Sequence, residues 1–220
     1  MIVGPVILRA ACRIGIGLWL MLIPAIAADA PARSAAEIMD ILMWNREPVG
    51  GPFELTDHTG KPRTERDFRG RLMLVYFGFT YCPDICPADL QAIGLALDKL
   101  GADGDSVQPL FITVDPERDT AEHLAEYVPM FHPRLIGLTG SAEAIRKAAD
   151  AYKVYYARVD PPKEDVKENV KEDCGYYTVD HTAYIYLMDR EGNYLGFFPP
   201  GTSADRMVEI IRPRLGETAR

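Results

Sequence analysis

The chain has 220 residues, of which 48% are hydrophobic and 25% charged, and its formal net charge is −8. This composition supplies enough apolar side chains for one globular core and lacks the features of a disordered chain. An acidic domain has no charge complementarity to phosphate backbones, so we expect no nucleic-acid partner.

The first 27 residues have the layout of a secretory signal. Arg9 and Arg13 precede an uncharged apolar run at residues 14–26, which ends in the small-residue triplet Ala25-Ile26-Ala27. We expect cleavage after Ala27, which removes two arginines and no acid and changes the formal charge from −8 to −10. The alternative is an uncleaved membrane anchor, although the run is shorter than the about 20 residues that a span needs. Either reading predicts a periplasmic or equivalent exported location, with membrane contact only through this segment.

Residues 28–49 are expected to form a linker and a short helix, and residues 50–216 to form the folded domain. Near its start, a strand at residues 53–55 and a turn at residues 57–60 predict an N-terminal β-hairpin. Residues 72–79 form a continuous apolar run, which is typical of a strand that is buried on both faces.

Helices and strands are expected to alternate through the middle of the chain. Apolar residues at helical spacing predict a helix that has Pro87 in its first turn and ends near Gly101. The next expected elements are a strand at 107–114, a helix at 120–130, a strand at 135–138 and a helix at 141–152. Such alternation is characteristic of α/β proteins.

The last third combines a loop, a hairpin and a helix. Residues 158–174 are charged and contain prolines without any periodicity, so a long exposed loop is predicted. Strands at 182–188 and 194–198 flank a turn signature, and Ser203 is expected to cap a helix that runs to about Leu215. The predicted fold class is therefore α/β, with a mixed central sheet flanked by helices, an N-terminal β-hairpin and a long loop before the last hairpin.

The cysteines carry the most specific chemical information. Cys12 leaves with the signal, so the exported chain keeps Cys82, Cys86 and Cys174 in an oxidising space, where cysteines pair unless a metal or a reductant intervenes. Cys82 and Cys86 lie where the buried strand passes into a helix, whose N-terminus is expected to favour both thiolates. Thiolates attack disulfides and bind soft metals. The three-residue gap suits chelation better than the two-residue gap of thiol–disulfide enzymes, without excluding a disulfide.

His181 is the candidate third ligand. It follows the long loop and directly precedes the predicted strand at 182–188, so it can point toward the cysteine loop. Two sulfurs and one imidazole suit copper(I). A closed zinc site normally has a fourth protein ligand, and only Cys174 is available as a fourth, so copper is favoured over zinc.

Three motifs resemble the Sco/SenC family. They are FGFTYCPDICP at residues 77–87, FITVDPERDT at residues 111–120 and VDHTAYIYLMDREG at residues 179–192. The resemblance covers most of residues 50–215 and implies a thioredoxin-like fold. It also implies a copper metallochaperone that serves the binuclear copper site of cytochrome c oxidase during assembly.

Carried over to this chain, the family's copper ligands fall on Cys82, Cys86 and His181, and the acid of the VDPERD run falls on Asp115. Asp115 ends the strand beside the cysteine strand, from where a carboxylate could tune the metal. The implied cargo is a copper ion, as Cu(I) or Cu(II). The implied partner is the copper-site subunit of the oxidase, and an upstream copper donor and a thiol reductant are compatible with this role. Cys174 departs from the family motif, and the sequence leaves its role open.

A thiol–disulfide oxidoreductase is the alternative function. Cys82 would attack a target disulfide and Cys86 would resolve it, for example to reduce the copper-site cysteines of the oxidase subunit, and His181 would be dispensable. Thioredoxin-type enzymes carry a proline where this chain has Asp180-His181, which argues against redox work as the only role. Whether the chain is an enzyme stays open at this point. A peroxidase on the same fold is a third alternative, supported only by the environment of the thiols.

Overall fold

The structure is a computed structural model that describes residues 1, 34–44, 47–161 and 177–216. Helix α1 (Ala35–Trp44) coincides with the predicted short helix. The hairpin of β1 (Glu54–Asp57) and β2 (Pro62–Thr64) follows, and its turn places Gly60 at a φ of +81°, which a residue without a Cβ adopts without strain. The predicted N-terminal β-hairpin is confirmed.

The other helices and strands follow along the chain with short loops and 3₁₀ turns between them. They are β3 (Leu72–Gly78), α2 (Ile85–Leu100), β4 (Val107–Thr113), α3 (Ala121–Tyr127), β5 (Ile136–Thr139), α4 (Ala142–Ala151), β6 (Tyr156–Val159), β7 (Thr178–His181), β8 (Ile185–Met188), β9 (Tyr194–Phe198) and α5 (Ala204–Leu215). The hydroxyls of Ser141 and Ser203 accept hydrogen bonds from the third residues of α4 and α5, which fixes where these helices begin.

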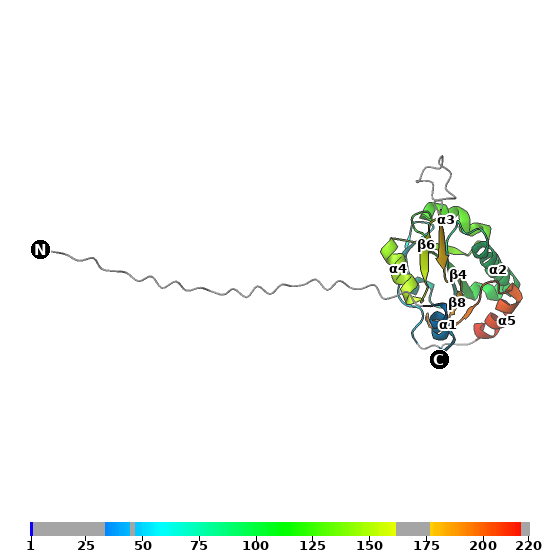
Figure 1. Ribbon diagram of the computed structural model, residues 1–220. Helices are drawn as coiled ribbons and strands as arrows, with labels where there is room; N and C mark the ends of the chain where they lie inside the picture. Colours follow the sequence, from blue (N-terminus) through cyan, green and yellow to red (C-terminus); the bar gives the residue numbers. More distant parts are fainter. Residues whose placement is uncertain (2–33, 45–46, 162–176, 217–220) are drawn as a thin grey trace. The chain divides into compact units, whose positions relative to one another are not determined.

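Seven strands form one mixed sheet in the order β2-β1-β5-β4-β3-β8-β9. Strands β3, β4 and β5 run parallel, whereas β1, β8 and β9 join antiparallel to their neighbours. Helices α2 and α5 pack together on one side of the sheet, and α4 lies on the other (Figure 1). The predicted α/β class with a mixed sheet flanked by helices is therefore confirmed.

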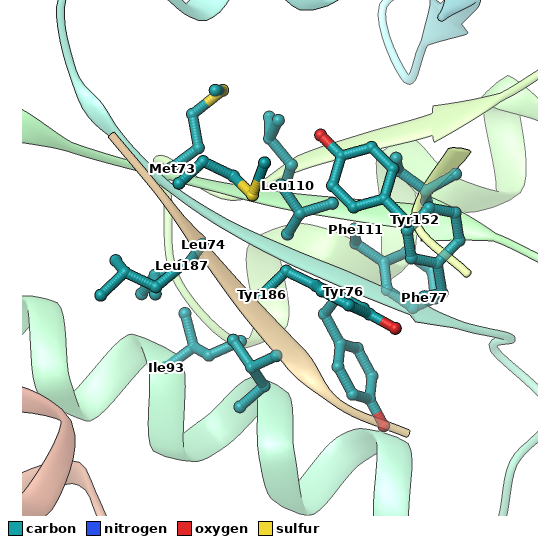
Figure 2. Close-up of a cluster of buried hydrophobic side chains, with 14 of the residues drawn as sticks. Met73, Leu74, Tyr76, Phe77, Ile93, Leu110, Phe111, Tyr152, Tyr186 and Leu187 are labelled. Carbon is teal, nitrogen blue, oxygen red and sulfur yellow. The ribbon is translucent and has the colours of Figure 1, made fainter. Parts of the chain in front are cut away.

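Strands β3 and β4 are buried along their whole length because helices cover both faces of the sheet. Figure 2 shows Leu74 and Leu187 next to Ile93 of α2. On the opposite face, the ring centroids of Phe77 and Tyr152 are 5.3 Å apart. This packing holds the end of β3 firmly, and the functional loop begins there.

Helix α1 belongs to the same core. Its Ile38, Ile41 and Leu42 are buried, as expected for apolar residues spaced three and four apart on one helical face. The sequence analysis placed the start of the folded domain at residue 50. The buried core begins earlier, in α1.

A second sheet, formed by β6 and β7 alone, was not predicted. The two strands pair antiparallel with Tyr156 opposite His181, so the predicted loop at 158–174 starts too early by at least two residues. The predicted strand at 182–188 also starts too early, because β8 begins at Ile185 and His181 ends β7. Each strand has only four residues, and Val179 alone among them is buried, so the alternation that marks a half-buried strand is too short to stand out in the sequence.

Two regions of the sequence analysis lie outside the described residues. They are residues 2–27 of the predicted signal and Cys174 with most of the predicted loop. In the part of the chain that the structure describes, no helix has the length and apolar character needed to cross a membrane.

Candidate metal centre

The two cysteines lie at the C-terminal end of β3, where the chain turns into α2. Cys82 precedes the helix and is partly exposed, and its N–H donates to the carbonyl of Phe79 at 3.3 Å. Cys86 lies in the first turn of α2 and is fully buried. Pro87 follows it at a position where the helix does not need a backbone donor. The predicted sequence of strand, cysteine loop and helix is confirmed.

The structure brings Cys82, Cys86 and His181 together. The sulfur of Cys86 lies 3.4 Å from Nε2 of His181, which comes from β7, 95 residues further along the chain. The backbone N–H of Cys86 points to the sulfur of Cys82 at 3.5 Å. Tyr76 and Phe79 contact the imidazole edge-on and fix the plane of the ring.

The position of the proton on His181 follows from its other nitrogen. Nδ1 lies 3.1 Å from the carbonyl oxygen of Thr182, and a carbonyl can only accept a hydrogen bond. Nδ1 must therefore carry the hydrogen in the neutral ring. Nε2 then presents a lone pair toward Cys86, which is the tautomer that a metal ligand requires.

The two thiols differ in acidity. The hydrogen bond from Cys86 lowers the pKa of Cys82 to about 3, although partial burial opposes this change. The same contact with Cys82, together with burial, raises the pKa of Cys86 above its usual range. The expectation that the helix N-terminus favours both thiolates is therefore wrong for Cys86. Two thiolates in contact repel each other, so ionising both costs free energy, and the more buried sulfur keeps its proton.

Asp115 lies just beyond the end of β4 and is nearly fully buried. Its carboxylate accepts hydrogen bonds from Nε of Arg118 at 2.5 Å and from the hydroxyl of Tyr177 at 2.6 Å. The guanidinium of Arg118 in turn lies 4.6 Å from the ring of Tyr81, the residue before Cys82. Asp115 therefore acts on the cysteine loop through Arg118 and Tyr81, and its carboxylate accepts hydrogen bonds from Arg118 and Tyr177 rather than from a candidate ligand.

The donor set can be compared with the size of a metal ion. Metal–sulfur and metal–imidazole bonds of about 2.3 and 2.0 Å, as at zinc, allow donors on one ion to lie at most about 4.3 Å apart. The 3.4 Å between Cys86 and His181 is within that limit. Among the described residues, no three His, Cys, Asp or Glu side chains are already arranged as a metal site, so a three-coordinate centre would require the side chains to move.

Sequence reasoning missed the residues that support this loop. Asp119 binds Thr80 of the loop through two hydrogen bonds, and Arg118 stacks on Tyr177 at 3.6 Å. These pairs are 39 and 59 residues apart in the sequence. No local pattern marks such pairs, and only the sheet brings them together.

Comparison with known proteins identifies the family. A model of the SCO1/SenC family matches residues 43–216. The chain belongs to the SCO1/SenC family. The three candidate ligands, together with Asp115 and Asp119, fall within the matched residues.

Individual SCO1/SenC relatives agree with this assignment. The mitochondrial SCO2 homologue of Mus musculus is 46% identical over 164 residues, which are 74% of this chain and only 60% of the mouse protein's length. The SCO2-like protein RP587 of Rickettsia prowazekii is 36% identical over 207 residues, covering 94% of this chain and 95% of that protein.

Among solved structures, copper-bound ScoI of Arabidopsis thaliana superposes with a TM-score of 0.67 at 41% sequence identity. That match covers 76% of this chain and 98% of the other. The thioredoxin-like fold that the motifs implied is thereby confirmed.

Proposed function

We propose that this chain is a copper metallochaperone that holds one copper ion between Cys82, Cys86 and His181 and delivers it to the binuclear copper site of cytochrome c oxidase. The observation that carries the proposal is the 3.4 Å contact between the Cys86 sulfur and Nε2 of His181 at the end of β3. Two similar proteins bind copper, since ScoI of Arabidopsis thaliana and yeast Sco1 were both solved with copper bound. Soft sulfur ligands with one imidazole favour copper over harder ions.

The burial of the ligands suits transfer as well as binding. Cys86 is fully buried, whereas Cys82 is partly exposed and could release the ion first to the ligands of an incoming partner. Exchange of one ligand at a time keeps the copper bound throughout, as Cu(I) or Cu(II). The proposed location is the periplasm or an equivalent exported space, with residues 1–27 as signal or anchor.

In the same proposal, Asp115 influences the copper ligands indirectly, through residues that contact the cysteine loop. Its bond to Arg118 holds that guanidinium against Tyr81 and so limits the movement of the residue next to Cys82. A carboxylate in this position tunes the site through orientation of the loop rather than by coordination.

The ligand set is tested by copper binding to His181→Ala. We expect the reduced variant to lose at least tenfold in copper(I) affinity, because a two-sulfur site lacks the third donor. His58→Ala is the matched control, since His58 accepts a hydrogen bond from the N–H of Gly137 in β5 and contacts neither cysteine. Equal affinity of the two variants would remove His181 from the site. In cells, His181→Ala should lower oxidase activity, with partial recovery when copper is added.

The contrast between the two thiols favours a second candidate, thiol–disulfide exchange. The Cys82 thiolate would attack a target disulfide and release one target thiolate. Cys86 would then lose its proton, attack the Cys82 sulfur and release the second target thiolate. Two electrons thereby pass from the cysteine pair to the target. A thiol reductant would have to restore the pair. His181→Ala separates the two functions, because reduction of a target disulfide should survive in a variant that no longer binds copper.

A further inference from the structure

Asp119 is a fully buried carboxylate that the proposed copper site does not use as a ligand. It lies in the turn between β4 and α3, where its N–H donates to the carbonyl of Asp115 at 2.9 Å. Oδ1 accepts from the hydroxyl of Thr80 at 2.6 Å, and Oδ2 accepts from the N–H of Thr80 at 3.1 Å and the hydroxyl of Thr113 at 2.6 Å. Burial removes a carboxylate from water, so it needs donors of this kind.

Thr80 connects this carboxylate to the cysteine loop. It lies two residues before Cys82, between the end of β3 and the start of α2. Its single hydroxyl hydrogen goes to Asp119, so its oxygen accepts from Nε2 of His123 at 2.9 Å. The next residue, Tyr81, is 55% exposed. Thr80 is thus the point at which this loop is fastened to the interior.

Metal ligands work only when their supporting residues hold them within about 0.5 Å of the required geometry. We propose that Asp119 is a positioning residue for copper: through Thr80 it fixes the loop so that Cys82 can share one ion with Cys86 and His181. The inference rests on the proposed function and extends it from the ligands to the residue that orders their loop. A purely structural role would affect the stability of the fold without affecting the metal.

The test is Thr80→Val in the reduced full-length chain, because valine keeps the shape of the side chain and replaces the hydroxyl with a methyl group that cannot form a hydrogen bond. We expect copper(I) affinity to fall at least tenfold and the sulfur-to-copper(II) charge-transfer absorption to shift. Thr80→Ser keeps the hydroxyl and should stay within about threefold of the wild-type affinity. In the copper-free protein, hydrogen exchange of the Cys82 amide should be faster in Thr80→Val, which reports on loop order without any metal. Thr80→Ala, with the same expectation, replaces the valine variant if that does not fold.

Thr59→Val is the matched control. The Thr59 hydroxyl also donates at 2.6 Å to a buried carboxylate, that of Asp57, in the turn between β1 and β2. Strands β5 and β4 separate this hairpin from β3. The control should lose stability and keep its copper affinity and absorption. Unchanged copper binding in Thr80→Val, or an equal loss in Thr59→Val, would overturn the positioning role alone. A wild-type chain that binds no copper would overturn the proposed function and this inference together.

Discussion

Gly78, the last residue of β3, gives the sulfur of Cys86 its space. A Cβ added at this position would lie 3.0 Å from the Cys86 sulfur and from ring atoms of Phe111 and Tyr76. Such contacts are closer than the roughly 3.5–4.0 Å at which non-bonded atoms attract. Gly78 does not have a positive φ, so room rather than backbone freedom explains the glycine.

Gly78→Ala should therefore weaken the metal site by displacing Cys86 from His181. We expect a loss of about 1–3 kcal/mol in unfolding free energy from overpacking, measured by denaturant titration, and at least a tenfold loss in copper(I) affinity. Gly140→Ala is the control, because its Cβ would meet Leu55 at 3.1 Å and touch no cysteine. If both variants lowered copper affinity alike, the displacement of Cys86 would not be the cause.

At the scale of elements, the β1–β2 hairpin is organised by one carboxylate. Asp57 accepts hydrogen bonds from the N–H and hydroxyl of Thr59, from the N–H of Lys61 and from Nε of Arg63, all within 3.1 Å. Burial alone would raise the pKa of Asp57, but the hydrogen bonds from Thr59, Arg63 and Lys61 outweigh it and hold the pKa below its usual range. The ionised side chain thus closes the turn.

This lowered pKa gives the hairpin a defined pH dependence. A carboxyl whose folded pKa is below its unfolded value of about 3.9 stabilises the fold above that value, and the contribution is lost as the pH falls through the folded pKa. Asp57→Asn should cost about 2 kcal/mol near neutral pH. Its difference from the wild type should shrink below about pH 4. Glu126→Gln, at an exposed site on α3, should behave as wild type throughout. A constant difference across the acid range would show that charge is not the cause.

Elements with strong local signals were predictable from the sequence, and those defined by distant partners were not. The bounds of β3 were predicted to within one or two residues from its continuous apolar run. The same holds for α4 and α5, whose starts are marked by the serine caps Ser141 and Ser203. Strands β6 and β7 have no such signal, because each exists only through pairing with the other. The same limit applies to the candidate site. Its cysteines and histidine stand in motifs, whereas the bond between Asp119 and Thr80 depends on two loops meeting at the sheet edge.

At the scale of the molecule, helix α1 extends the packed unit beyond the family's matched region, which starts at residue 43. The helix packs against β9, the edge strand of the large sheet, and the hydroxyl of Tyr194 donates to the carbonyl of Leu42 at 3.2 Å. Covering an edge strand in this way protects its unpaired backbone groups. Residues 32–220 accordingly form one compact unit.

Neighbouring residues on α1 provide a direct test of this packing. Leu42 is 3% exposed and Met43 is 60% exposed, although they differ by one position. Leu42→Ala should cost about 2–5 kcal/mol in unfolding free energy, because it removes buried methyl groups and leaves a cavity. Met43→Ala should stay within about 0.5 kcal/mol of the wild type. Both variants should bind copper as the wild type does while they remain folded, because neither touches the cysteine loop. Equal stability of the two would mean that α1 does not pack against the sheet in solution, and that the folded domain begins near residue 50 as the sequence alone indicates.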